Sequence, residues 1–192
     1  TVTYEDPAQR DPAQLAALRD LLARSFPRVH ALPHELVAGG TLLFTWRGRD
    51  AALPPVLLMA HQDVVPVEDE RQWSHPPFAG EVHDGFVWGR GALDMKSQTA
   101  AEVVAATTLA RDGWRPAKGE LLVMVVADEE AGGTYGAQFL TEQHPDKVRC
   151  DYLINEGSGD RVELGGSAYY LCSVSEKMSA PFRLRVLGRS GH

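Results

Sequence analysis

The apolar run ELLVMVVA at residues 120–127 restricts the choice of fold more than any other part of the sequence. The run is far shorter than the ~20 residues that a helix needs to span a bilayer. It also lacks the alternation of apolar and polar residues that a half-exposed strand shows. We therefore expect a central strand of a sheet that is covered on both faces.

Strands and helices are predicted to alternate along the chain. Apolar runs predict further strands at residues 41–46, 56–60 and 152–154. Helices are expected after the Asp11–Pro12 pair, which is a typical helix start, at residues 96–110 and at about 134–142. This order predicts an α/β fold with a mostly parallel central sheet flanked by helices.

Three other segments have distinct patterns. Residues 64–80 are proline-rich and are expected to form a rigid loop. Residues 81–89 predict a short hairpin that turns at Asp84–Gly85. Residues 182–186, FRLRV, alternate like a strand and could begin a second unit.

The composition argues against some partners. A formal net charge of −7 and a pI near 5.5 argue against binding to nucleic acid. The first residues are polar and contain no signal-peptide core, although the lack of an initiator Met leaves room for a removed leader. Two cysteines, Cys150 and Cys172, are too few for a disulfide framework. We expect a cytoplasmic protein with no nucleic-acid partner and no membrane partner.

Acidic residues and one histidine collect where the predicted strands and the hairpin end. His61 and Asp63 follow the strand at 56–60, and residues two apart in an extended chain project from the same face. The other ends carry carboxylates at Asp94, Glu129, Glu130 and Glu156. Because ligands of open α/β sheets collect at the carboxyl ends of the strands, we expect these side chains to meet at one edge.

Each of these residues also has an ordinary structural explanation. His61 and Asp63 could end a strand in a polar turn, and Asp94 could cap a helix. The DEE run at 128–130 could be a charged helix entrance, and Glu156 could be a loop acid. Their shared position at strand ends favours a joint function over four unrelated ones.

The chemistry of this residue set indicates divalent cations. Carboxylates packed together without partners repel and raise one another's pKa values. One histidine with several acids suits Zn²⁺ or a similar ion, and one carboxylate can bridge two ions about 3.5–4 Å apart. In this interpretation His61 binds a metal, and Asp63 accepts the other ring N–H and so fixes the imidazole.

Five motifs in order give the sequence a family resemblance. MAHQDVVPV, WSHPPFAG, DGFVWGRGALDMK, VVADEEAGG and INEGSG resemble the aminoacylase/carboxypeptidase S family of dizinc hydrolases, from about Leu15 to His192. Acetylornithine and succinyl-diaminopimelate deacylases look like more distant relatives. The resemblance implies a metal-dependent hydrolase that cleaves amide bonds of N-acyl amino acids or peptides carrying a free carboxylate, and a homodimer for the full-length protein.

The resemblance also implies a role for each site residue. His61 binds the first metal with Asp63 orienting it, and Glu129 is the general base. His192 reaches the partner subunit's site and steadies the developing oxyanion. The metal ligands implied are His61, Asp94 as the bridge, Glu130 for the second ion and Glu156 for the first. The ions are expected to be Zn²⁺, two per complete site, with Co²⁺ or Mn²⁺ as substitutes.

The domain boundaries and one backbone feature also follow from the resemblance. Residues 1–174 correspond to the N-terminal part of a catalytic metal-binding domain, and residues 175–192 to the truncated beginning of an α+β lid or dimerisation domain. The peptide bond after Asp94 is expected to be cis, as the corresponding bond of the family is.

The sequence departs from the family pattern in two ways. Met95 stands where the family commonly has a second Asp, which we expect to be tolerated because that acid is not a ligand. The late histidine of the second metal has no match, because the remaining histidines carry no matching motif: His30, His34, His75, His83 and His144. One complete and one incomplete metal site are therefore expected within these residues.

Two alternatives remain open. The chain could be a truncated or non-catalytic relative that binds metal without hydrolysing anything. A nucleotide-binding α/β domain fits poorly, because GRGALDMK is neither a GxGxxG fingerprint nor a P-loop.

Overall fold

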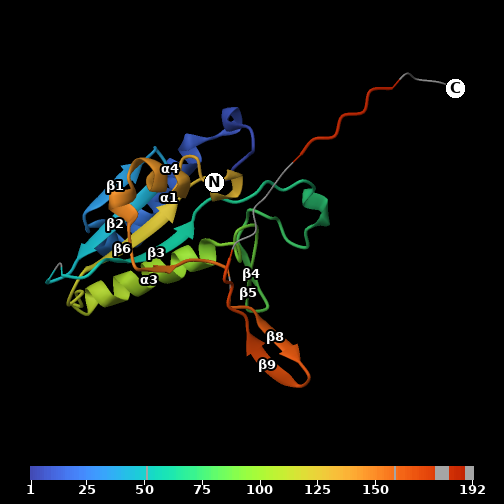
Figure 1. The fold of residues 1–192 in the computed structure, drawn as a ribbon. Coiled ribbons are helices and arrows are strands. Elements are labelled where there is room, and N and C mark those ends of the chain that lie inside the picture. The colour runs from blue at the N-terminus through green and yellow to red at the C-terminus, as the bar shows by residue number, and fades with distance from the viewer. Residues whose placement is uncertain (51, 158, 176–181, 189–192) are drawn as a thin grey trace. The chain divides into compact units, whose positions relative to one another are not determined.

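A five-stranded sheet forms the centre of the computed structural model, which describes residues 1–50, 52–157, 159–175 and 182–188. The strand order is β1-β2-β6-β3-β7 (Figure 1). The strands of this sheet are β1 (His34–Val37), β2 (Thr41–Arg47), β3 (Val56–His61), β6 (Glu120–Val126) and β7 (Tyr152–Ile154). A separate hairpin pairs β4 (Glu81–His83) with β5 (Phe86–Trp88).

From β3 onward, helices alternate with the strands of the central sheet, as the sequence predicts. The α-helices are α1 (Pro12–Ser25), α2 (Pro27–His30), α3 (Lys96–Arg111), α4 (Ala137–Gln143) and α5 (Pro145–Val148). Short 3-10 helices are η1 (Pro7–Gln9), η2 (Glu70–Gln72) and η3 (Glu129–Ala131). Asp11 caps α1 as expected, since its carboxylate accepts the N–H of Ala13 at 2.9 Å. Among the described residues, no helix is both long and apolar enough to cross a membrane.

The sheet is mixed, with a parallel part that carries the strand ends of interest. β3 pairs in parallel with β6 on one side and with β7 on the other. β2 pairs antiparallel with β6 and with β1. β1 is a strand that no sequence pattern predicted. It joins β2 through a tight turn in which Ala38 and Gly39 have φ values of 47° and 73°.

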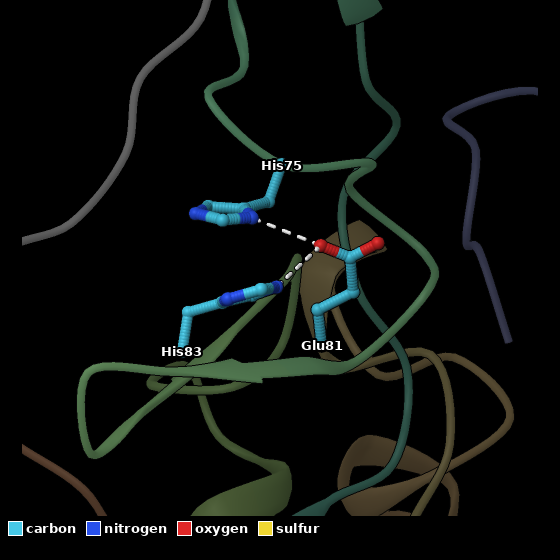
Figure 2. A group of neighbouring side chains, drawn as sticks. All are labelled: His75, Glu81 and His83. Atoms are coloured by element: carbon cyan, nitrogen blue, oxygen red, sulfur yellow. Dashed lines mark hydrogen bonds and ion pairs between the residues drawn. The ribbon is translucent and has the colours of Figure 1, made fainter.

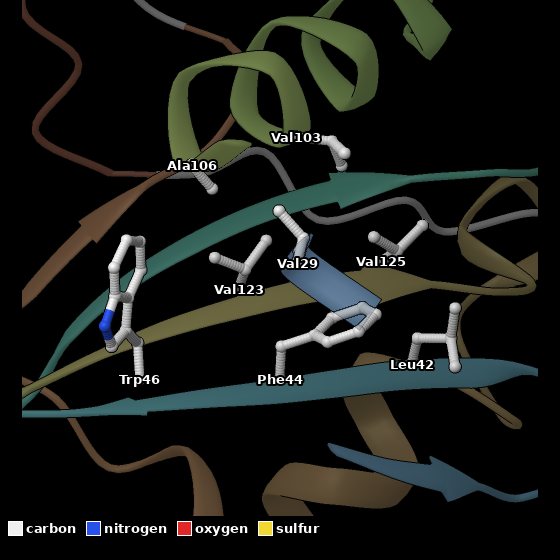
Figure 3. Close-up of a cluster of buried hydrophobic side chains, with 8 residues drawn as sticks. All are labelled: Val29, Leu42, Phe44, Trp46, Val103, Ala106, Val123 and Val125. Atoms are coloured by element: carbon white, nitrogen blue, oxygen red, sulfur yellow. The ribbon is translucent and has the colours of Figure 1, made fainter. Parts of the chain in front are cut away.

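Two apolar layers confirm that β6 is covered on both faces. Val123 and Val125 of β6 belong to the layer that α2 and α3 cover (Figure 3). Leu122, Met124 and Val126, which alternate with them, belong to a layer on the other face together with Leu140 of α4. Successive residues of a strand point to opposite faces, so an unbroken apolar run is what a doubly covered strand requires.

Replacing Leu140 by alanine is expected to destabilise the protein strongly. The Leu140 side chain is 0% exposed, so its loss removes buried apolar surface and leaves a cavity. Leucine-to-alanine changes at such sites lower the free energy of unfolding by about 2–5 kcal/mol. Urea denaturation of Leu140→Ala measures the loss. Leu21→Ala, at an α1 position that is 51% exposed, is the matched control, and equal losses for both variants would contradict this account.

The chain divides into two compact units, residues 1–156 and 157–192. The second unit contains the hairpin of β8 (Arg161–Leu164) and β9 (Ser167–Tyr170). The domain boundary predicted from the sequence lies after residue 174. The assignment of a catalytic domain at 1–174 and a lid at 175–192 stays a prediction.

The prediction of a strand at residues 182–186 is wrong. Residues 182–188 have no regular secondary structure, and Phe182, Leu184 and Val186 are 91%, 82% and 81% exposed. An alternating pattern makes a strand only when a neighbouring strand supplies hydrogen bonds. None of the described residues pairs with this segment as a strand.

Candidate metal centre

The carboxyl ends of β3, β6 and β7 bring the predicted residues together. His61 is the last residue of β3, Glu129 begins η3 directly after β6, and Glu156 follows β7. Asp94 lies two residues before α3 and makes no cap on it, which removes the simple capping explanation. Because β3 runs parallel to both neighbours, these ends share one edge of the sheet.

The His61 imidazole is the centre of the cluster. Its Nε2 lies 3.0 Å from Oδ1 of Asp94, 3.5 Å from Oε1 of Glu156 and 3.9 Å from Oε2 of Glu129. The imidazole is only 1% exposed, whereas these three carboxylate side chains are 34–66% exposed. The site therefore has a buried nitrogen at its base and carboxylates that solvent and ligands can reach.

The orientation of His61 leaves one ring nitrogen for a ligand. Nδ1 lies 3.0 Å from the backbone carbonyl oxygen of Asp63. A carbonyl oxygen can only accept a hydrogen bond, so Nδ1 carries the hydrogen. In the neutral imidazole, Nε2 then has a free lone pair that points at the carboxylates.

Asp63 makes different contacts from those predicted. Its Oδ1 is 3.7 Å from His61 Nδ1, longer than a hydrogen bond, and the backbone carbonyl of Asp63 holds the ring instead. Its two carboxylate oxygens accept the backbone N–H groups of Glu129 and Glu130, each at 3.2 Å. Asp63 is buried and so fixes the start of the segment that carries both glutamates.

Several polar residues that the sequence analysis did not select hold the end of β3. Gln62 is fully buried, and its Nε2 donates to the carbonyls of Gly40 (2.8 Å) and Val125 (3.1 Å). Thr99 of α3 donates to the carbonyl of His61 at 3.3 Å, and Lys96 donates to that of Gln62 at 2.5 Å. The sequence contained a signal for Gln62. Side chains alternate along an extended chain, so Gln62 points away from His61 and Asp63 and into the protein.

The close charges shift one another's pKa values. Burial lowers the pKa of His61, but Asp63, Glu156 and Asp94 outweigh burial and raise it above its ordinary value. Burial raises the pKa values of Glu129, Glu130 and Glu156, and neighbouring carboxylates raise them further against the opposing effect of His61. Without a cation these groups therefore release their protons at a higher pH than usual, and divalent ions relieve the repulsion that causes this.

The donor set fits divalent cations. Two groups, His61–Asp94–Glu130 and His61–Glu129–Glu156, each place one nitrogen and two carboxylate oxygens within 4.8 Å of one another. Nitrogen and carboxylate oxygen are ligands that Zn²⁺ accepts. The two groups share only His61, whose Nε2 has one lone pair and so can bind one ion. These groups differ from the predicted ligand sets. The prediction assigns Glu156 and Asp94 to the first ion and Glu130 to the second, whereas the structure groups Glu130 with Asp94 and Glu156 with Glu129.

The remaining predicted features are placed as follows. The Asp94–Met95 peptide bond is cis, which confirms that expectation. Met95 is buried, at 2% exposure. His192 lies outside the described residues.

Comparison with known proteins decides the family. The model of peptidase family M20/M25/M40 matches residues 57–182, a range that contains His61, Asp94, Glu129 and Glu156. The chain belongs to this family. The resemblance to dizinc peptidases drawn from the motifs is thereby confirmed.

Individual members of family M20/M25/M40 agree with this assignment. Carboxypeptidase S of Saccharomyces cerevisiae is 39% identical over 185 residues, which cover 91% of this chain and 32% of that protein. The N-fatty-acyl-amino acid synthase/hydrolase PM20D1 of Bos taurus is 34% identical over 202 residues, covering 100% of this chain and 39% of that protein. The chain thus spans about a third of the length of these relatives.

A solved structure supports the fold. The M20 family metallo-carboxypeptidase Sso-CP2 of Sulfolobus solfataricus superposes with a TM-score of 0.60 at 21% identity. The match covers 76% of this chain and 32% of that one. The α/β fold with helices on both faces of the sheet is therefore the fold of an M20 peptidase.

Proposed function

We propose that these residues form the metal-binding part of a hydrolase that cleaves amide bonds of N-acyl amino acids or peptides carrying a free carboxylate. The observation that carries this proposal is the buried Nε2 of His61, which faces carboxylate oxygens of Asp94, Glu156 and Glu129 at 3.0–3.9 Å. The names of carboxypeptidase S and the N-fatty-acyl-amino acid hydrolase support the substrate class.

In this proposal His61, Asp94, Glu130 and Glu156 would hold the ions, and Asp94 would be a ligand of both. When bound, such ions lower the pKa of a water molecule and polarise the substrate carbonyl. Zn²⁺ is the ion that we propose, because one imidazole with carboxylates suits it, while Co²⁺ and Mn²⁺ accept similar ligands. A ligand from outside the described residues would complete the second position.

Glu129 is the proposed proton carrier. Its side chain is 46% exposed and lies beside the proposed metal ligands, so water can reach it. Burial first, and the neighbouring acids next, raise its pKa towards the range in which a carboxylate exchanges protons efficiently. Glu129 would take a proton from the attacking water and return it to the leaving nitrogen. His192 is proposed to stabilise the carbonyl oxygen as its charge develops.

Asp63 is a positioning residue in this scheme. Its carboxylate accepts the N–H groups of Glu129 and Glu130, and its carbonyl accepts Nδ1–H of His61. One buried residue thus sets the proposed base and two proposed ligands at once. We also propose that the full-length protein is a homodimer, which rests on the family resemblance. Its proposed cytoplasmic localisation rests on the free thiols of Cys150 and Cys172.

The test is hydrolysis of N-acyl amino acids and dipeptides by the purified protein. We expect turnover of substrates with a free carboxylate, little turnover of their carboxyl-amidated counterparts, and loss of turnover after chelation with recovery on adding Zn²⁺. Activity that survives complete removal of metal would refute the proposal. Metal binding without any turnover would favour the alternative, a relative that binds metal and does not hydrolyse.

A further inference from the structure

A second group of side chains that could bind a metal shares no residue with the candidate metal centre. His75 belongs to the loop after β3, and Glu81 and His83 belong to β4 (Figure 2). The same oxygen of Glu81, Oε2, lies 2.9 Å from Nδ1 of His75 and 3.3 Å from Nε2 of His83. The two imidazoles stack, with ring centroids 4.6 Å apart and an interplanar angle of 26°.

The hairpin presents two of the three side chains together. Glu81 and His83 are two residues apart in β4 and therefore project from the same face. The hairpin turns at Asp84 and Gly85 with φ values of 52° and 82°, the left-handed conformations that a two-residue turn requires. The indole N–H of Trp88 also donates to the carbonyl of His83 at 3.3 Å, so both strands hold this ligand.

The loop is fixed against the hairpin at the third side chain. The His75 ring packs against the Trp88 ring, with ring centroids 4.6 Å apart. Just beyond His75, the carbonyl of Pro77 accepts the N–H of Arg90 at 2.7 Å, which ties the loop to the chain that leaves β5. The His75 side chain is 23% exposed, and those of Glu81 and His83 are 36% and 55% exposed. The three groups are thus placed by the fold and still accessible to an ion.

Their spacing suits one tetrahedral ion. Zn²⁺ binds nitrogen and carboxylate oxygen at about 2.0–2.2 Å, so tetrahedral ligand atoms lie about 3.3–3.5 Å from one another. The two nitrogen-to-oxygen distances of 2.9 and 3.3 Å are close to this value, and all three ligand atoms lie within 4.8 Å of one another. Two histidines and one glutamate also form a recurrent ligand set for Zn²⁺ that leaves a fourth position for water.

We propose that His75, Glu81 and His83 bind one transition-metal cation of the Zn²⁺ class, at a site separate from the His61 centre. The ion joins the loop to the β4–β5 hairpin, because one ligand comes from the loop and two from β4. This assignment does not depend on the hydrolytic function. The competing explanation is a hydrogen-bonded cluster in which both imidazoles donate to Glu81 and no ion enters.

Metal stoichiometry separates the two explanations. The purified protein is stripped with a chelator, and the number of Zn²⁺ ions bound per chain is measured by titration calorimetry. We expect His83→Ala to bind one ion fewer than the wild-type protein. His34→Ala is the matched control, because His34 also belongs to a histidine pair (ring centroids 4.5 Å apart), but its Nδ1 contacts the carbonyl of Leu32 and not a carboxylate.

A spectroscopic measurement tests the proposed ligands without relying on the number of ions bound. In protein labelled with ¹⁵N-histidine, Zn²⁺ is expected to shift the ring signals of His75 and His83 and to leave that of His34 in place. Equal ion counts for the wild-type protein and His83→Ala would overturn the proposal. So would unshifted signals of His75 and His83, or the loss of one ion in both alanine variants.

Discussion

Glu129→Gln is expected to lower kcat by about 10²–10⁴-fold, the usual contribution of a positioned proton carrier, while the protein keeps its metal. The amide is close in size to the carboxylate but cannot accept a proton. The backbone N–H of Glu129, which donates to Asp63, is unchanged by the substitution. The defect should therefore fall on turnover and not on assembly of the site. Steady-state kinetics and elemental analysis of the same preparation measure the two effects.

The control for this variant is another glutamate in the same unit. Glu142→Gln alters a carboxylate of α4 whose oxygen accepts the side-chain amide of Gln138 at 2.9 Å, and we expect wild-type kcat. Wild-type turnover by Glu129→Gln would exclude Glu129 as the base. Loss of both metal and activity would instead assign it to the ligands.

Zn²⁺ is expected to stabilise the protein much more at pH 7.5 than at pH 5.5. The raised pKa values of Glu129, Glu130 and Glu156 mean that the metal-free folded state binds more protons than the unfolded state above about pH 4.5, their ordinary value. The raised pKa of His61 extends this difference above 6.5. The free energy of unfolding of the metal-free protein therefore falls as pH rises through these values.

Metal binding reverses this trend, because the ligands must lose their protons to bind an ion. With Zn²⁺ at about 100 times Kd, the gain is about 2.7 kcal/mol, or roughly 5–11 °C in Tm for a protein of this size. Thermal melts of chelator-treated and Zn²⁺-loaded protein at both pH values measure it. The His83→Ala background removes the proposed His75–Glu81–His83 site from the measurement, and His61→Ala in that background should show almost no gain. A larger gain at pH 5.5 would contradict the assignment of these ligands.

Local patterns were sufficient to predict β6, α3 and the β4–β5 hairpin. Each depends on residues close in sequence, namely an unbroken apolar run, a helical run rich in alanine, and an Asp-Gly turn. Pairing between distant segments was harder to predict. The antiparallel pairing of β2 with β6 and the addition of β1 depend on which strand edges are free, and the segment at 182–186 has strand-like alternation without a strand.

The sequence by itself determined which chemical groups stand at the strand ends, because the length and period of an apolar run fix where it stops and which polar residue follows. His61, Glu129, Glu130 and Glu156 could be selected in this way, and Asp94 by its place after the predicted hairpin. Only the tertiary structure decided the contacts between them. Asp63 binds backbone groups 66 and 67 residues away, and His75 meets Glu81 and His83 across a loop. Such contacts depend on the register and packing of whole elements, which no local pattern encodes.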